Sequence, residues 1–297
     1  MVLGEEHWEW DHGGDNFVTL IDPNNLDTMY LEGVFGGIGR KDLKTGKNHG
    51  IRPGPAPEGK KLRFNWMTPF ILSHYDSKTL YAGANMLFKS ENRGDQWTCI
   101  SPDLSTNPGP ERQGDVPFGT ITDISESPLK KGLLYAGTDD GQLHVTRDDG
   151  ATWTKINKGL PNRWVSRVVA SKYDEGTVFV SLTGYREDDF EAYLYMSTDF
   201  GETWKSIVNN MPSESINVIR EDPTDKDILY VGTELGAYCS IDKGKTWHSL
   251  CKTLPTCAVH DLALHAGTGD LVAGTHGRSV FVLHAKEIQK MKQEMAK

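Results

Sequence analysis

One short phrase occurs four times along this chain of 297 residues. The copies span residues 90–97, 146–153, 197–204 and 240–247, and their glycines lie 56, 51 and 43 residues apart. Repeats of roughly 40–50 residues are typical of β-propellers, in which every repeat forms one small sheet. The repetition therefore favours one large all-β domain over two ordinary domains.

The phrase itself predicts a hairpin turn. In residues 197–204 (STDFGETW) a hydroxyl residue is followed by an acid, then by glycine, and then by Thr-Trp. The acid can accept backbone N–H bonds, glycine supplies a positive φ, and tryptophan starts the outgoing strand and packs inward. In the first copy Asn92 and Gln96 replace the usual Asp and Thr, so a looser turn is expected there. We expect structural roles for the acid, glycine and tryptophan of the other three copies: Asp148, Gly150, Trp153, Asp199, Gly201, Trp204, Asp242, Gly244 and Trp247.

A second pattern separates the copies: an apolar run, a turn rich in Pro, Asp and Lys, and a strand that carries tyrosine and ends in glycine. Each repeat thus offers four strands, A to D, with the hairpin phrase between C and D. Four-stranded antiparallel blades around an axis leave only short, protected edges. The predicted fold is an all-β propeller, with seven blades as the alternative to six. The six expected blades cover about 16–53, 65–101, 120–157, 164–208, 216–251 and 258–284.

The two ends of the chain complete this prediction. The last blade has no D strand after residue 284, whereas residues 7–11 (HWEWD) are strand-like, carry two tryptophans and precede the first blade. We expect this N-terminal segment to close the last blade. Residues 285–297 are helix formers without Gly or Pro, and Ile288, Met291 and Met295 give them a thin apolar stripe. A short C-terminal helix is expected there, either exposed or docked on a partner.

Composition excludes several classes of function. A net charge of −9 argues against nucleic acid or an anionic membrane as the main partner. No apolar stretch approaches the roughly 20 residues needed to span a bilayer. The first residues lack the basic and apolar runs of a signal peptide, so the chain is cytosolic or its numbering starts after a removed leader or upstream domain. The four cysteines leave the compartment open, because Cys251 and Cys257 could pair or, with Cys99 and Cys239, remain free thiols.

The hairpin phrase resembles the Asp-box, or BNR, repeat of sialidases, xyloglucanases and sortilin-type propellers. Segments such as 13–17 (GGDNF), 63–69 (RFNWMTP) and 274–278 (GTHGR) are similar to the second propeller of large bacterial sortilin/VPS10-like proteins, usually labelled glycosyl hydrolase, BNR repeat. The resemblance covers nearly the whole chain. Members of that family are typically longer, with another propeller upstream and a leader for export. The resemblance therefore implies a secreted or periplasmic protein, of which this chain is a fragment or a compact relative; a cytoplasmic location is expected if Met1 is native.

Candidate site residues gather on one face of the predicted propeller. The A–B turns and the hairpin phrases lie on one face, and the B–C and D–A loops lie on the other, where propellers usually place their sites. A glycosidase needs two carboxylates roughly 5–10 Å apart, and the candidates for that role are Asp123, Asp139, Asp140 and Asp261. The candidate binding residues are Trp164, Arg167, Arg220, Glu234, His260, His276 and Arg278.

These residues favour recognition over catalysis. A sialidase grips a carboxylate with three arginines; Arg167, Arg220 and Arg278 are candidates by placement, but the Arg-Ile-Pro signature of sialidases is absent. His260 and His265 fall on opposite faces of their strand, so no metal site is predicted, and no cofactor motif occurs. The leading hypothesis is a non-catalytic recognition or scaffold propeller that binds a polypeptide or glycan, or docks against another propeller or subunit. The alternative, implied by the resemblance, is a glycoside hydrolase that cleaves a polysaccharide or a sialoside.

Overall fold

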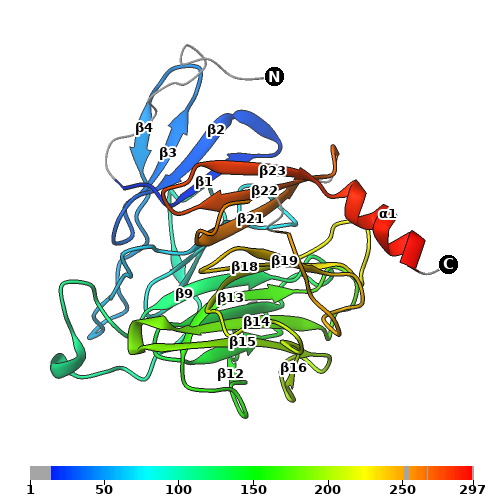
Figure 1. Cartoon of the computed structure of the whole chain (residues 1–297). Helices are drawn as coiled ribbons and strands as arrows, with labels where there is room; N and C mark the ends of the chain where they lie inside the picture. Colours follow the sequence, from blue (N-terminus) through cyan, green and yellow to red (C-terminus); the bar gives the residue numbers. More distant parts are fainter. Residues whose placement is uncertain (1–14, 251–253, 266, 296–297) are drawn as a thin grey trace.

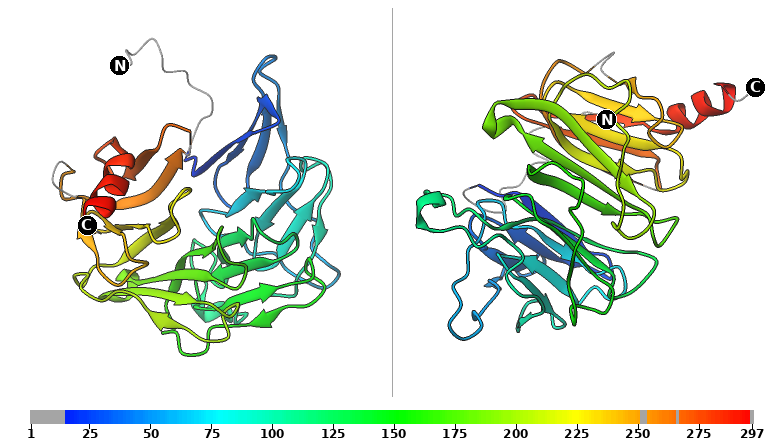
Figure 2. Two further views of the ribbon diagram at one scale, coloured as in Figure 1. Left: turned by 90° about the vertical axis from the view of Figure 1, so that its right-hand side faces the viewer. Right: turned by 90° about the horizontal axis from the view of Figure 1, so that it is seen from below.

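Each repeat of the sequence folds into one antiparallel sheet. The computed structural model describes residues 15–250, 254–265 and 267–295, and the strands in these ranges form six sheets around a common axis (Figure 1, Figure 2). The six-bladed β-propeller expected from the repeats is therefore confirmed. The closing strand expected at residues 7–11 lies outside the described residues.

The first five sheets each contain four strands in chain order. The first blade holds β1 (Val18–Asp22), β2 (Asn25–Glu32), β3 (Ile38–Asp42) and β4 (Asn48–Gly50), and the second holds β5 (Phe70–Leu72), β6 (Leu80–Gly83), β7 (Leu87–Ser90) and β8 (Thr98–Cys99). The third holds β9 (Ile121–Glu126), β10 (Leu134–Thr138), β11 (Leu143–Thr146) and β12 (Thr154–Lys155). The fourth holds β13 (Trp164–Ala170), β14 (Val178–Gly184), β15 (Asp189–Ser197) and β16 (Lys205–Ser206). The fifth holds β17 (Ile216–Glu221), β18 (Leu229–Thr233), β19 (Ala237–Ser240) and β20 (His248–Ser249).

The sixth sheet has three strands among the described residues: β21 (Val259–His265), β22 (Asp270–Thr275) and β23 (Val280–His284). The first strands of neighbouring blades contact one another, from β9 to β13, β17 and β21, so these A strands surround the axis. Two short 3-10 helices lie on the B–C and D–A face: η2 (Pro110–Arg112) in the long connection between β8 and β9, and η3 (Tyr185–Glu187) in the short connection between β14 and β15. Side chains at the start of each A strand therefore meet at one end of the channel.

The repeated hairpin phrase forms the same turn in each copy. In the fourth blade the Ser197 hydroxyl accepts the Gly201 N–H at 2.8 Å, and the Asp199 carboxylate accepts the N–H and hydroxyl of Thr203 at 2.9 and 2.6 Å. Hydrogen bonds from Ser197 and Thr203 lower the pKa of Asp199 to about 2. Phe200 and Gly201 both have positive φ, so the turn uses two left-handed residues where the sequence indicated glycine alone. In the first copy, Asn92 still accepts the N–H of residue 96, at 2.9 Å.

The tryptophan of each phrase links its blade to the preceding one. The indole N–H of Trp153 donates to the Ile100 carbonyl at 2.8 Å, and that of Trp204 donates to the Ile156 carbonyl at 2.7 Å. Ile100 and Ile156 each lie three residues after the tryptophan of their own blade. The same bond joins Trp97 to Ile51 at 2.9 Å and Trp247 to Ile207 at 2.7 Å. A ladder of four indole hydrogen bonds therefore runs along the propeller.

Apolar clusters fill the joints between consecutive blades from the first to the sixth. Four B-strand tyrosines are fully buried in them, and burial of such a ring stabilises the fold by about 1.5–3 kcal/mol. Each of the five joints contains buried residues from both of the blades that form it. In chain order, one such pair from each joint is Tyr30 with Phe70, Tyr81 with Ile124, Tyr135 with Val168, Phe179 with Ile219, and Tyr230 with Leu262. Packing between blades, rather than within one sheet, thus makes the core.

The C-terminal helix α1 (Lys286–Met295) packs on its own propeller (Figure 1). Ile288 is 5% exposed and joins the apolar cluster of the fifth and sixth blades. The ammonium of Lys292 lies 2.7 Å from the Asp225 carboxylate on the β17–β18 turn. The helix expected from the sequence is confirmed, and its docking surface is the chain itself.

None of the described helices is long and apolar enough to cross a bilayer. Cys99, Cys239 and Cys257 are free thiols, while Cys251 lies outside the described residues. Burial raises the pKa of the Cys239 thiol to about 11, so this thiol stays protonated near neutral pH.

Candidate functional site

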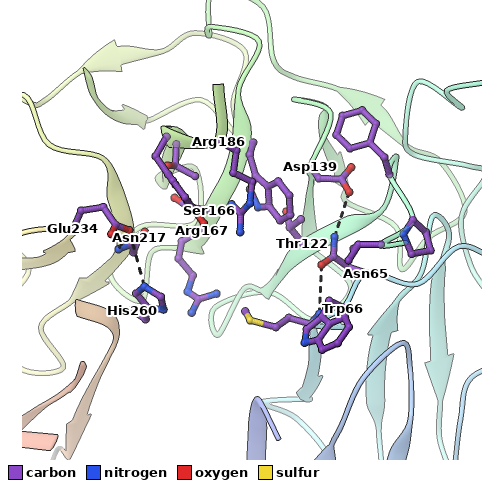
Figure 3. A pocket seen from close by; sticks show the side chains of 17 residues that line it. Asn65, Trp66, Thr122, Asp139, Ser166, Arg167, Arg186, Asn217, Glu234 and His260 are labelled. Carbon is purple, nitrogen blue, oxygen red and sulfur yellow. Dashed lines mark hydrogen bonds and ion pairs between the residues drawn. The ribbon is translucent and has the colours of Figure 1, made fainter. Parts of the chain in front are cut away.

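The mouth of the channel on the B–C and D–A face is a pocket of about 470 Å³ (Figure 3). Three kinds of segment line it: the D–A connections around Trp66 and Phe118, the B–C loops around Asp139 and Arg186, and the first residues of β13, β17 and β21. In Figure 3, His260 and Arg167 lie on one side of the pocket and Trp66 lies on the other. Five of the six blades, or the connections next to them, therefore contribute to one hollow.

Hydrogen bonds between A strands fix the walls of this pocket. Thr122 donates to the Val165 carbonyl and Ser166 donates to the Ile216 carbonyl, both at 2.7 Å. Asn217, at the equivalent place in β17, donates to the carbonyl of the next A strand at 3.4 Å. Each bond ties one blade to its successor at the rim of the channel. Equivalent side chains of successive A strands therefore fix the shape of the channel mouth.

Two arginines and two aspartates form a closed charge cluster beside the pocket. Arg220 lies 2.6 Å from Asp261, and Arg167 lies 3.5 Å from both Asp123 and Asp261. Asp123 also accepts the Val168 N–H at 2.7 Å. Burial raises the pKa of Asp123, against the opposing effect of the two arginines. The cluster brings together four of the residues that the sequence suggested, and it leaves their charges balanced.

The other two candidate catalytic acids hold loops. Asp139 is buried and accepts four hydrogen bonds, from the N–H groups of Gly119 and Thr120 at 2.9 and 2.8 Å, the Thr120 hydroxyl at 2.7 Å and the Asn65 amide at 3.2 Å. Burial raises the pKa of Asp139 to about 6. Asp140 accepts the N–H and hydroxyl of Thr106, both at 2.7 Å. Every acceptor direction of Asp139 is therefore occupied by protein.

Aromatic and apolar side chains give the pocket an exposed, non-polar floor. Trp66 is 38% exposed and Met67 is 47% exposed, and the Trp66 ring packs edge-on against Phe35 with centroids 5.0 Å apart. The Arg186 guanidinium stacks 4.2 Å above the Trp164 ring. Of these residues, the sequence had indicated Trp164. Trp66 belongs to the 63–69 segment noted for its family resemblance, which was the signal available for it.

A polar wall of the pocket lies between the fifth and sixth blades. The Asn217 amide donates to the Glu234 carboxylate at 2.9 Å, and His260 Nε2 lies 4.0 Å from the same carboxylate. The His260 and His276 rings meet edge-to-face with centroids 5.0 Å apart. Burial lowers the pKa of His260, so the imidazole is neutral near neutral pH. Arg278 is exposed on the β22–β23 turn, outside the pocket lining.

In the described ranges, no group of three or more His, Cys, Asp or Glu side chains is arranged to hold a metal ion. The pocket offers a ligand aromatic surface, neutral hydrogen-bonding groups, the exposed Arg186 guanidinium and the partly exposed Glu234 carboxylate. This combination suits binding of a polar molecule that also has an apolar face.

Comparisons with known proteins agree with this fold. No family model matches the chain. The xyloglucanase of Hypocrea jecorina (strain QM6a) is 27% identical over 133 residues, which cover 40% of this chain and 16% of that protein. An ancestral GH74 enzyme superposes with a TM-score of 0.67 at 15% identity, over 91% of this chain and 36% of that one. The GH74 xyloglucanase from Xanthomonas campestris superposes with a TM-score of 0.63 at 17% identity, over 89% of this chain and 44% of that one.

The chain thus spans less than half the length of each of these three proteins. At these identities the solved structures establish the fold alone. They support a glycosyl hydrolase-like repeat propeller, and they do not single out the sortilin/VPS10 proteins.

Proposed function

We propose that this propeller binds an uncharged oligosaccharide in the mouth pocket and does not cleave it. One observation carries the proposal: exposed aromatic surface at Trp66 lies in the same 470 Å³ hollow as the Asn217 amide and the His260 imidazole. Sugars present apolar C–H faces to aromatic rings and hydroxyl groups to fixed polar side chains. The similarity to xyloglucan-cleaving proteins supports a glycan as the ligand.

The charge balance of the site favours an uncharged sugar over a sialoside. A sialoside carboxylate needs arginines that are free to form bidentate bonds. Arg167 and Arg220 are instead engaged by Asp123 and Asp261, and the third arginine of the pocket, Arg186, is stacked on the Trp164 ring. Breaking these partly buried ion pairs to admit a sugar carboxylate would leave an aspartate without its partner, which is costly.

The carboxylates of the site argue against hydrolysis. Glycosidases need one acid to donate a proton and a second to act as base or nucleophile. Asp139 and Asp140 hold loops, and Asp123 and Asp261 are paired with arginine. Glu234 is the remaining acid of the described pocket lining, and its carboxylate is partly exposed. The described part of the pocket therefore lacks the second free carboxylate that hydrolysis requires.

Calorimetric titration of the protein with xyloglucan oligosaccharides, cello-oligosaccharides and sialyllactose tests this proposal. We expect binding of an uncharged oligosaccharide, and a roughly tenfold or greater loss of affinity in Trp66→Ala, equivalent to about 1.4 kcal/mol. Leu129→Ala is the matched control, because Leu129 is exposed on the β9–β10 turn at the opposite face and should leave the affinity unchanged.

Product analysis of the same mixtures tests the absence of catalysis. Release of shorter sugars that is abolished in Glu234→Gln would show that the propeller is a hydrolase. A panel in which no glycan binds, while a polypeptide binds and is lost in Trp66→Ala, would replace the glycan with a peptide ligand, as the sortilin resemblance suggests. Binding confined to sialyllactose would contradict the argument from the paired arginines.

A further inference from the structure

The connection between the second and third blades is much longer than the repeat requires. β8 ends at Cys99 and β9 begins at Ile121, so 21 residues (100–120) join these blades, whereas eight residues join β12 to β13 and nine join β16 to β17. This β8–β9 loop carries η2 and projects from the rest of the propeller (Figure 1, Figure 2). A connection of more than about 12–15 residues in a compact domain usually has a function of its own.

Hydrogen bonds hold the β8–β9 loop in one shape. The Gln113 side chain spans its tip: the amide nitrogen donates to the Phe118 carbonyl and the amide oxygen accepts the Phe118 N–H, both at 3.0 Å. Nearer the second blade, the Asp140 carboxylate accepts the N–H and the hydroxyl of Thr106, both at 2.7 Å. A loop that is already ordered in this way loses little conformational entropy when a ligand binds to it.

A second hollow, of about 290 Å³, lies between this loop and the fourth blade, and we call it the side pocket. It shares three lining residues with the mouth pocket: Phe118, Asp139 and Trp164. Phe118 and Trp164 are half-buried, so their rings form an aromatic ridge between the two pockets. The residues that line the side pocket but not the mouth pocket include Thr106, Glu111, Arg112, Asn162, Arg163 and Glu187.

The side pocket suits a ligand rich in hydroxyl groups. Two arginines and four acids line it, so it has no excess of positive charge for an anion. Arg163 lies 3.4 Å from Glu187, whereas Arg112 lies over the Phe118 ring, 4.8 Å from its centroid, without an acidic partner among the described residues. Charged side chains form stronger hydrogen bonds with neutral hydroxyls than neutral side chains do.

We propose that the side pocket is a second subsite for the ligand of the mouth pocket, so that this ligand is a carbohydrate chain long enough to cross the Phe118–Trp164 ridge. The inference rests on the proposed function, because it starts from an uncharged sugar in the mouth pocket. One part of the chain packs on Trp66, and the continuing part passes over Trp164 and presents hydroxyls to Arg112. The second part is tethered to the first, so its contacts add affinity without a second full cost of association.

Calorimetric titration of the full chain with cellobiose and with cellohexaose tests this inference. We expect cellohexaose to bind roughly tenfold or more tightly than cellobiose. Arg112→Ala should weaken cellohexaose binding roughly fivefold or more and leave cellobiose binding unchanged. Asn162→Trp, which fills the side pocket with a large ring, should bring the affinity for cellohexaose close to that for cellobiose. Arg147→Ala is the matched control, because Arg147 is also exposed and lies over a phenylalanine ring, that of Phe200, 4.0 Å from its centroid on the opposite face.

The variants are needed because a longer chain also has more ways to place one part of itself in the mouth pocket alone. Equal affinities for the two sugars, or a difference that persists in both Arg112→Ala and Asn162→Trp, would confine the ligand to the mouth pocket. Either result would overturn the inference and leave the proposed function standing. Absence of binding for both sugars would count against an uncharged glucan chain, and so against the inference and the proposed function together.

Discussion

The buried carboxyl of Glu32 should make the stability of this propeller depend on pH. Glu32 ends β2 and is 0% exposed, and it accepts the Thr68 N–H at 3.0 Å. Its second oxygen is buried without a hydrogen-bond partner. Burial raises the pKa of Glu32 from 4.5 to about 8. The folded protein therefore carries a protonated Glu32 near neutral pH.

The sign and size of the effect follow from these two pKa values. Between pH 4.5 and about 8 the unfolded chain loses the Glu32 proton while the folded chain keeps it, so the free energy of unfolding falls as the pH rises. At about 1.4 kcal/mol per pH unit, the full difference between these two pKa values is on the order of 5 kcal/mol. Glu32→Gln has the shape of the protonated acid and cannot ionise. The variant should match the parent protein near pH 4.5 and exceed its stability increasingly up to pH 8.

Urea unfolding followed by tryptophan fluorescence, at intervals from pH 4.5 to 9, measures the free energy of unfolding of the parent protein and of Glu32→Gln as a function of pH. The other titratable groups are the same in the parent protein and in Glu32→Gln, so the difference between their free energies of unfolding at each pH reports Glu32 alone. Glu126→Gln is the control: Glu126 is equally buried but accepts bonds from Ser73, His74 and Tyr81, so an amide there should lower stability by about 1–3 kcal/mol at every pH. Curves for Glu32→Gln and the parent that stay parallel across this range would refute the reasoning.

Three further changes test the packing between blades. Trp204→Phe keeps an aromatic ring, although a smaller one, but loses the indole bond to Ile156, and should lower the free energy of unfolding by about 1–2 kcal/mol in urea. Gly137→Ala would place a methyl group against the Val165 side chain in the joint between the third and fourth blades, and should lower the thermal midpoint through a loss of about 1–3 kcal/mol. Lys292→Met removes the ion pairs of α1 with the β17–β18 turn; it should cost less than about 1 kcal/mol and speed amide exchange within α1 only. A loss of global stability well above about 1 kcal/mol in Lys292→Met would contradict the packing described. Unchanged stability in Trp204→Phe and Gly137→Ala would contradict it as well.

The blades could be predicted from the sequence because local patterns build them. In each hairpin phrase the residues that make the turn are within eight positions of one another, as with the Asp242 carboxylate and the Thr246 N–H, 2.8 Å apart. The tyrosines of the B strands recur with the repeat and are buried in the joints. The positive φ of Phe200 could not be predicted, because the pattern there offers glycine as the residue suited to that conformation.

The site could be predicted less completely. Their place on the B–C and D–A face of the predicted propeller indicated Arg167 and His260, which line the pocket. Trp66 lies on the long connection between β4 and β5, and Arg186 lies on the short turn between β14 and β15; no periodicity sets the path of either segment. The pairing of Arg220 with Asp261 also could not be foreseen, because it depends on how far one blade is rotated against the next.

Binding of a sugar at the channel mouth is tested most directly by ¹H–¹⁵N spectra of the tryptophan indoles during titration with a xyloglucan oligosaccharide. We predict that the signals of Trp66 and Trp164 shift, since both rings line the pocket. The four ladder tryptophans should keep their signals, because their N–H groups are bonded to neighbouring blades near the opposite face: Trp97, Trp153, Trp204 and Trp247. Shifts confined to the ladder tryptophans, or no shift with any uncharged oligosaccharide, would contradict the proposed site.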